Sequence, residues 1–220
     1  MTNRKTSTRA DGEQTRQRIL AAAGELFAQT GFAETTNKAI AAKAKVDLAS
    51  INYHFGNRNG LYQQALATAH RHLININDLK ALQNQDLPSE QKLTQLIERV
   101  CERTLSEPNW YAQILAREVL SPSSNLTVLI NEEIQPKMAI LKSLLSNVSG
   151  IPEHAPELMP CLVSVMAPCL MLLVTRNFDP NPLKAVHAMP SKHVIEQLSC
   201  YALAGLKAVG NRYQQQQPKP

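Results

Sequence analysis

The stretch IAAKAKVDLASINYHFGNRNGLY, residues 40–62, decides the fold of the N-terminal part of the chain. Its apolar residues fall at helical spacing on both sides of the segment Ala44-Lys45-Val46. Five residues after Val46 comes Ile51, where an apolar side chain would anchor a second helix to a core. The pattern predicts a helix-turn-helix whose second helix spans Leu48–Phe55. A helix of this size enters a DNA major groove about 12 Å wide.

Helical patterns continue on both sides of this stretch. Asp11 is suited to cap a preceding helix, which we expect to end at Gly31. The apolar face of that helix consists of Ile19, Leu20, Ala23, Leu26 and Phe27. Thr35 or Thr36 begins the first helix of the motif, and Asn57 caps a helix that runs to Leu73.

Beyond residue 74 the sequence predicts a second, larger helical domain. Residues 75–88 are polar and end in Pro88, which indicates a linker. The helices expected after it span about 89–105, 109–120, 126–147, 156–176 and 191–209. No stretch alternates with a period of two, so we expect an all-α protein of about nine helices. The expected domains are 1–12, a flexible basic arm; 13–74, the helix-turn-helix domain; 75–88, the linker; 89–210, the ligand-binding and dimerisation domain; and 211–220, a disordered tail.

Charge is distributed unevenly along the 220 residues. The formal net charge is +5, and residues 1–58 account for +4 of it with nine Lys or Arg and five Asp or Glu. A basic segment of this kind is expected where a chain meets a polyanion such as DNA. The longest apolar run, Leu162–Thr175, is shorter than the roughly 20 residues of a membrane helix and contains Pro168. We therefore expect a cytoplasmic protein that does not enter a membrane.

The sequence offers little for catalysis or metal binding. It has no Gly-rich phosphate loop, no GxSxG, no HExxH and no paired cysteine motif. His70 and His72 stand two apart on a helix and point about 200° apart. The four cysteines are scattered, as expected for buried thiols that act as small apolar residues. We expect no enzyme activity, no metal and no cofactor.

Two groups of stretches resemble a known family. TRQRILAAAGELFAQTGFAETT (15–36) and the stretch at 40–62 resemble the N-terminal domain of the TetR family of transcriptional regulators, over about residues 13–66. The block INYHFGNRNGLY (51–62) is the most specific part. Three later stretches resemble, more weakly, the CecR-type branch of that family: WYAQILAREVLSPSS (110–124), NEEIQPKMAILKSLL (131–145) and LVSVMAPCLMLLV (162–174). The resemblance implies a homodimer, a ligand pocket in the larger domain, and release of DNA when a small molecule binds.

The resemblance also implies which residues contact DNA. At the start of the first motif helix, Thr36 would contact a phosphate and Lys38 a base edge. The positions that face the bases on the recognition helix are Leu48, Ala49 and Ser50, and Asn52 would contact either adenine or a phosphate. The positions that hold the sugar-phosphate backbone are Tyr53, His54 and Arg58.

Several of these roles have structural alternatives. Leu48 and Ala49 cannot hydrogen-bond through their side chains, so they would read by apolar contact, for instance with a thymine methyl group. Tyr53 is alternatively a packing aromatic, and His54 a partly buried structural residue. The basic arm, with Arg4, Lys5 and Arg9, either follows phosphates or an adjacent minor groove, or is a solvated tail.

Three departures from the family pattern bear on DNA binding. Lys45 stands at the turn position that usually holds glycine, so we expect a positive φ there. Asn52 replaces a common aromatic residue. Asn59 and Gly60 replace acidic residues, and Gly60 should weaken the start of its helix by up to about 1 kcal/mol.

The larger domain supplies candidates for a ligand pocket. These are apolar or aromatic residues of three expected helices: Trp110, Tyr111, Ile114, Leu115, Met138, Leu141, Met166, Cys169 and Met171. Pro168 interrupts its helix, and we expect a kink or widening near 164–168 that opens space for the ligand. All of these residues are alternatively ordinary core. Arg117 and Glu118 would orient the ligand's polar group or form a structural ion pair.

A second copy of the chain is the expected partner of the larger domain. The helix expected at 156–176 is apolar on nearly every side, which one domain of this size rarely covers. Paired with the last helix, it would form a four-helix interface about a two-fold axis. The expected interface residues are Leu162, Val165, Leu173, Leu198, Tyr201, Ala202 and Gly205. The alternative is that both helices are buried within one chain.

The sequence thus favours a DNA-binding transcriptional regulator. It would be a repressor that binds a palindromic operator as a dimer and is released by a small hydrophobic or amphipathic effector. The alternative is a dimeric small-molecule-binding or interaction protein that has lost DNA binding.

Overall fold

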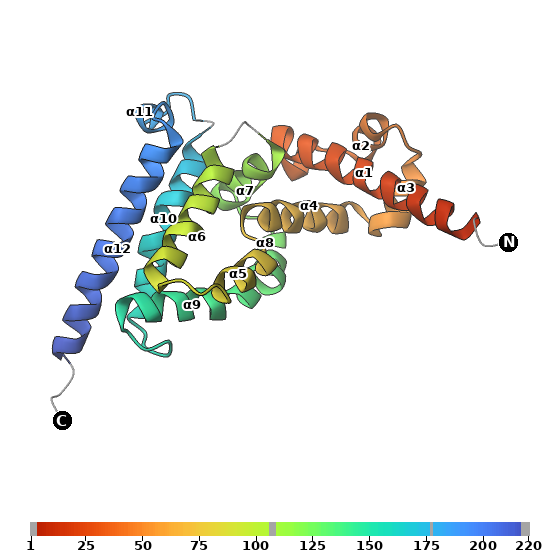
Figure 1. Ribbon diagram of the computed structural model, residues 1–220. Helices are drawn as coiled ribbons and strands as arrows, with labels where there is room; N and C mark the ends of the chain where they lie inside the picture. The colour runs from red at the N-terminus through yellow and green to blue at the C-terminus, as the bar shows by residue number, and fades with distance from the viewer. Residues whose placement is uncertain (1–3, 106–108, 177, 217–220) are drawn as a thin grey trace. The chain divides into compact units, whose positions relative to one another are not determined.

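All secondary structure in the described residues, 4–105, 109–176 and 178–216, is helical in this computed structural model (Figure 1). The expected all-α fold with an N-terminal helix-turn-helix is confirmed. The chain divides into two compact units, one of residues 1–70 with 108–132 and one of residues 71–107 with 133–220. The sequence placed residues 108–132 in the larger domain, whereas the structure places them with the helix-turn-helix.

The first unit begins with helix α1 (Arg4–Glu34), which contains one non-helical residue, Gly31 (φ 85°), where we expected the helix to end. The expected start at Asp11 is wrong, because α1 already begins at Arg4. The residues between them include good helix formers such as Arg9 and Ala10, which extend the helix. The part of the expected flexible arm from residue 4 onward is therefore helical, and residues 1–3 lie outside the described residues.

The other helices at the start of the chain follow the sequence closely. They are α2 (Asn37–Ala44), α3 (Leu48–Phe55) and α4 (Arg58–Leu73). Their core is apolar and aromatic: the ring of Phe27 on α1 meets the edge of Tyr62 on α4 at a centroid distance of 4.8 Å, and Phe32 lies 4.7 Å from Tyr62. Ile40 and Ile51 are fully buried, so α2 and α3 are anchored as the spacing predicted.

Helix α7 (Trp110–Leu120) packs on α1 within this unit. The contact requires Gly24, because a Cβ at that position would lie 2.4–2.6 Å from the ring of Trp110. Further along α7, Arg117 donates to the carbonyls of Ala28 and Gln29 at 2.5 and 2.6 Å. These contacts explain why a segment distant in sequence belongs to the helix-turn-helix unit.

Glu118 joins α7 to α4. Its buried carboxylate accepts hydrogen bonds from the Tyr62 hydroxyl at 2.7 Å and from the amide and hydroxyl of Ser123 at 2.9 and 2.8 Å. Burial, together with this carboxylate, raises the pKa of Tyr62 well above its ordinary value. Arg117 and Glu118 thus bond to separate partners within the unit, so both residues have structural roles.

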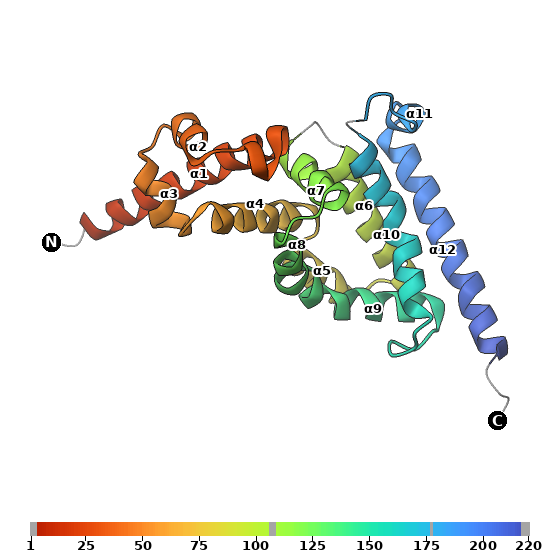
Figure 2. The ribbon, with the colours of Figure 1, turned by 180° about the vertical axis from the view of Figure 1, so that it is seen from behind.

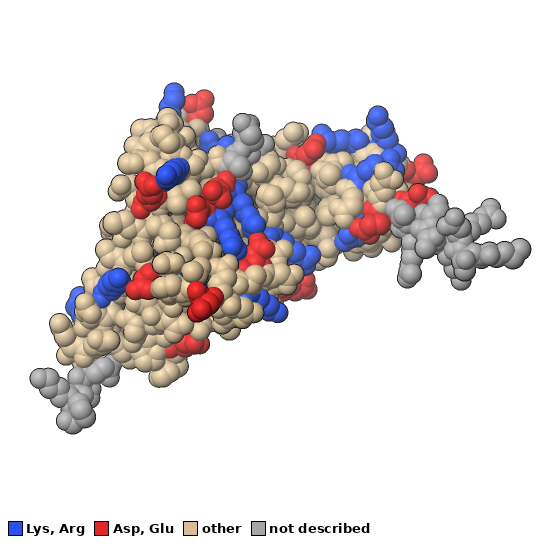
Figure 3. All heavy atoms as spheres, in the orientation of Figure 1, with Lys and Arg blue, Asp and Glu red and all other residues tan. Residues whose placement is uncertain are grey.

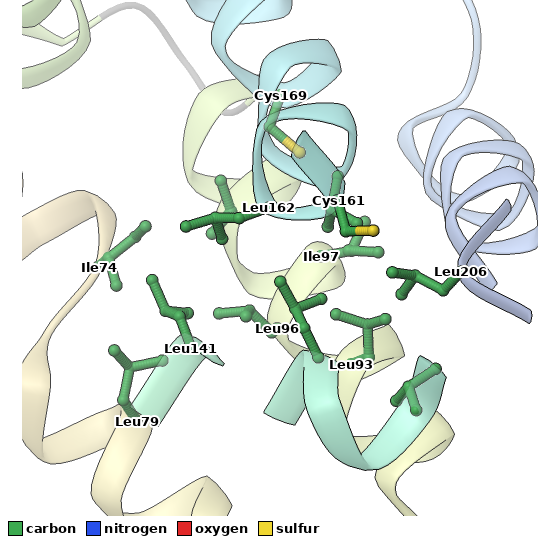
Figure 4. Close-up of a cluster of buried hydrophobic side chains, with 14 of the residues drawn as sticks. Ile74, Leu79, Leu93, Leu96, Ile97, Leu141, Cys161, Leu162, Cys169 and Leu206 are labelled. Atoms are coloured by element: carbon green, nitrogen blue, oxygen red, sulfur yellow. The ribbon is translucent and has the colours of Figure 1, made fainter. Parts of the chain in front are cut away.

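The second unit is a bundle of helices around one apolar core (Figures 1 and 2). Its helices are α5 (Ile76–Gln83), α6 (Ser89–Leu105), α9 (Gln135–Ser149), α10 (Leu158–Thr175), α11 (Lys184–His187) and α12 (Ser191–Gln216). Figure 4 shows leucine and isoleucine side chains of α5, α6, α9, α10 and α12 converging in this core. The chain enters α9 through α8 (Asn125–Leu129) and a π-helical segment (Ile130–Ile134), where we expected one continuous helix.

The expected linker at 75–88 is wrong for its first half, which forms α5. Asn75 caps this helix by accepting a hydrogen bond from the amide of Asn77 at 2.8 Å. Leu79 and Leu82, three residues apart, are both 2% exposed and pack into the core. We expected a linker because most of the other residues in this segment are polar.

The last helix is longer than expected. We placed its end at Gly210 and a disordered tail after it, but α12 continues through Gly210 to Gln216, and residues 217–220 lie outside the described residues. A Cβ at Gly210 would lie 1.8 Å from the carbonyl oxygen of Ser149. Glycine at this position therefore allows α12 to approach the end of α9 closely and does not stop the helix.

Helix α10 is long and apolar enough to cross a membrane by length and composition, although half of it is buried inside the chain against its neighbours. It remains α-helical from Leu158 to Thr175, with Pro168 inside it. The expected widening near residues 164–168 is therefore wrong, since no π-helical or irregular turn occurs there.

Two glycines of α1 test the packing of α7. Gly24→Ala forces the Trp110 ring to move, so we expect it to lower the free energy of unfolding by about 1–3 kcal/mol. Gly12→Ala is the matched control, because a Cβ there meets nothing within 4 Å and should stabilise the helix by up to about 1 kcal/mol. Urea denaturation of both variants measures the difference, and equal effects would contradict this packing.

Candidate nucleic-acid interface

The turn between α2 and α3 is left-handed at Lys45, with φ and ψ both 53°, so the expected positive φ is confirmed. The amide of Lys45 bonds back to the carbonyl of Ala42 at 3.3 Å, and that of Val46 to the carbonyl of Ala41 at 3.1 Å. Lys45 therefore adopts the conformation that glycine would adopt, at a cost of about 1–2 kcal/mol. Its exposed side chain also adds a cation beside the motif.

Helix α3 buries one side and exposes the other. Ile51 is fully buried, while Leu48 is 52% and Tyr53 is 84% exposed. Ala49 and Asn52 are exposed as well, and Ser50 is half-buried. The structure thus exposes four of the six side chains of this helix that were predicted to contact bases or backbone, since His54 is half-buried like Ser50. These four side chains carry no formal charge.

The start of α2 carries the two remaining contacts expected on this side of the motif. Thr36 is the N-cap, and its hydroxyl oxygen accepts the amide of Ala39 at 3.1 Å. The same hydroxyl can still donate its hydrogen to a phosphate oxygen. Lys38, the second residue of the helix, is exposed. In Figure 3 basic side chains gather at this end of the unit, with acidic side chains among them.

Arg58 has a structural role that the sequence did not indicate. Its guanidinium donates to the carbonyl of Thr35 at 2.8 Å and lies 4.5 Å from the centre of the Phe32 ring. These contacts hold the α1–α2 connection, directly before Thr36. The side chain of Arg58, which was expected to contact the DNA backbone, therefore binds within the unit.

The first turn of α4 depends on Asn57 and Gly60. Asn57 accepts a hydrogen bond from the amide of Gly60 at 2.9 Å and so caps α4, as predicted. A Cβ at Gly60 would lie 2.4 Å from the carbonyl oxygen of Phe55, so only glycine fits where we expected mere helix weakening. His54 is half-buried, with its ring 5.0 Å from that of Tyr53.

Comparison with known proteins agrees with this geometry. Residues 19–65 match the family model of bacterial regulatory proteins of the tetR family, and residues 89–206 match that of the C-terminal domain of the HTH-type transcriptional dual regulator CecR. The chain belongs to the TetR family, with a CecR-type C-terminal domain. The CecR protein of Shigella flexneri is 28% identical over 149 residues, which are 63% of this chain and 66% of that relative, just under two thirds of its length.

Solved structures of TetR-type regulators share the fold. A TetR-like transcriptional regulator from Rhodococcus sp. RHA1 matches with a TM-score of 0.66 and 16% identity, over 87% of this chain and 95% of that one. The fatty acid degradation regulator FadR from Bacillus halodurans matches with a TM-score of 0.68 and 15% identity, over 86% and 98%. Both relatives are named as regulators, and neither name describes an enzyme.

The ligand residues expected for this TetR-family chain fall in both units. Trp110, Tyr111, Ile114 and Leu115 belong to the first unit, where Trp110 packs on Gly24. Met138, Leu141, Met166, Cys169 and Met171 belong to the second unit. There Cys169 is buried with its Sγ 3.5 Å from that of Cys101, while Met171 is 48% exposed. Ile114, Leu115, Leu141 and Cys169 are buried, while the others are half-buried or exposed, and a ligand role for the set stays a prediction.

The residues expected at a dimer interface divide in two. On α10, Leu162, Val165 and Leu173 are buried within the single chain, so the predicted face of this helix needs correction. The large apolar side chains that α10 leaves exposed are Met159, Val163, Leu170 and Met171. On α12, Tyr201 is 77% exposed, Gly205 is exposed, and Leu198 and Ala202 are half-buried. The spacing 159, 163, 170 is a second helical stripe that the sequence analysis missed.

The strain at Lys45 gives a direct test of the turn. Lys45→Gly should raise the free energy of unfolding by about 1 kcal/mol, because glycine adopts a positive φ without a steric penalty. Ala42→Gly, three residues earlier and exposed within α2, should lower it by about 1 kcal/mol. Thermal or chemical denaturation without DNA compares the two variants, and a loss of stability in Lys45→Gly would refute the left-handed turn.

Proposed function

We propose that the protein is a transcriptional repressor that binds a palindromic operator as a homodimer. The observation that carries the proposal is the exposed, uncharged face of α3, anchored by Ile51 beneath it, in a chain of the TetR family. This exposed face has no packing role within its unit, whereas a DNA major groove would bury it. A regulator of this kind acts on DNA, so we place it in the cytoplasm.

Base reading and backbone binding would be divided between the two motif helices. Leu48 and Ala49 suit apolar contact with thymine methyl groups, and Asn52 suits an adenine edge or a phosphate. Contacts to the backbone or to a neighbouring base would come from Tyr53, Thr36 and Lys38. Ser50 and His54, which are half-buried, would contribute to the same surface. Arg58 would act indirectly, by fixing the loop before Thr36.

The dimer would form through α10 and α12, which lie side by side in both views (Figures 1 and 2). Their exposed apolar residues include Val163 at 62% and Tyr201 at 77%. Large exposed apolar side chains on adjacent helices are typical of an interaction surface. A second copy would bury them in a four-helix arrangement and would present two α3 helices to successive turns of DNA. A small hydrophobic or amphipathic effector would release the operator by changing the separation of these helices.

Operator binding is tested with DNA fragments selected from a random pool. We expect a palindromic site whose affinity falls steeply with salt, because phosphate contacts release counterions. If Lys38 contacts a phosphate instead of the base edge that the resemblance implies, Lys38→Gln should reduce the slope of log K against log salt by about 0.9. Lys43→Gln is the control, since Lys43 is paired with Glu25 at 2.8 Å and should change the slope less.

The reading by Leu48 is tested in the same assay. Replacing one contacted thymine by uracil removes its methyl group and should weaken wild-type binding several-fold at that position, while a Leu48→Ala variant should not discriminate between the two bases. Absence of operator binding at about 50 mM salt would instead favour a protein that has lost DNA binding.

The dimer surface is tested by introducing charge. Val163→Glu should convert the dimer to a monomer in analytical ultracentrifugation, because a buried, unpaired carboxylate opposes association. Val119→Glu is the control, as Val119 on α7 is 43% exposed and lies outside this surface. A dimer that persists in Val163→Glu at micromolar concentration would place the interface elsewhere.

A further inference from the structure

The second unit contains a partly enclosed cavity of about 60 Å³ between α5, the start of α6 and α9. Its apolar lining consists of Leu79, Leu82, Ile140 and Leu144. Its polar lining consists of Gln83, Ser89, Lys92, Ser143 and Asn147. None of these nine residues is acidic, and none is among the ligand residues expected from the sequence.

Two features of the cavity favour an anion. The ammonium of Lys92 donates to the carbonyl of Gln83 at 2.7 Å, which fixes the charge at the end of α5. An ammonium carries three N–H groups, so this bond leaves donors for a ligand. Ser89 is the first residue of α6, a helix of 17 residues, whose N-terminal amides and dipole add a partial positive charge.

The apolar part of the cavity lies next to a second cavity. A second cavity, of about 10 Å³, lies between α5 and α6 and shares Leu79 and Leu82 with the first. These two side chains therefore border both cavities. A water molecule needs about 10–15 Å³ of such volume, so 60 Å³ corresponds to a ligand of about four to six non-hydrogen atoms.

We infer that this cavity binds a small monocarboxylate. The carboxylate lies at Lys92 and Ser89, and the short alkyl group packs against Leu82 and Leu144. The regulatory consequence rests on the proposed function. The cavity would be the site that binds the effector, and the effector would be a monocarboxylate. The small number of ligand atoms keeps the dissociation constant in the millimolar range.

Propionate is the probe, and propionamide is its neutral counterpart of equal size. Isothermal titration calorimetry on the full chain without DNA should show saturable propionate binding in the millimolar range and at least tenfold weaker binding of the amide. Lys92→Met should remove that preference, and Leu144→Phe should abolish both by filling the cavity. Lys142→Met, on α9 but outside the lining, is the matched control and should bind as wild type.

The outcomes separate this inference from the proposed function. Equal binding of acid and amide, no saturation at 100 mM (roughly a hundred times the expected constant), or wild-type binding by Leu144→Phe would each overturn the site. If the protein binds its operator but not propionate, the inference fails and the repressor stands. If it binds propionate but no operator, the site stands and the repressor fails. Propionate that binds without changing operator affinity overturns the regulatory consequence.

Discussion

The attachment of α7 to α1 is the constraint on which the helix-turn-helix unit depends. Trp110 lies on Gly24, and the guanidinium of Arg117 takes up the carbonyls of Ala28 and Gln29 in the last turn of α1. Both carbonyls lie just before Gly31, the non-helical residue of α1, where a cation interacts favourably with the helix dipole. The unit is consequently assembled from two distant segments, and the chain passes between the units after residues 70, 107 and 132.

A second arginine completes this arrangement. Arg58 on α4 holds the carbonyl of Thr35, while Arg117 on α7 holds the carbonyls that precede Gly31. The α1–α2 connection is therefore fixed at both ends by helices outside the motif, and Thr36 and Lys38 directly follow it. Because α4 continues into the second unit and α7 is flanked by two of the three chain crossings, both helices are covalently linked to the part of the chain that holds the cavity. If the cavity binds the proposed ligand, this covalent link would connect it to Thr36 and Lys38, which are proposed to contact DNA.

The sequence predicted local features well and close approaches poorly. Helical spacing and caps located α3 and the cap at Asn57, and the glycine-to-lysine departure at Lys45 correctly implied a left-handed turn. Gly210 was interpreted as a helix end, because a pattern along one chain does not show that Ser149 lies against it. Buried charge was missed for the same reason. Lys137 is 3% exposed and pairs with Glu133 at 3.3 Å; burial lowers the pKa of Lys137, and the paired carboxylate opposes that shift.

The uncharged face of α3 has a consequence for how affinity and specificity are divided. Tyr53 and its exposed neighbours on this helix carry no formal charge, so α3 contributes little to the salt-dependent part of DNA binding. That part must come from cations outside α3, of which Lys38 and Lys45 are exposed on either side of it. Sequence preference would then change through substitutions in α3 while overall affinity changes through substitutions in α2 and the turn. The turn fits this division. Lys45 adopts a strained left-handed conformation there, and in return its side chain adds a cation close to α3, which contains no Lys or Arg.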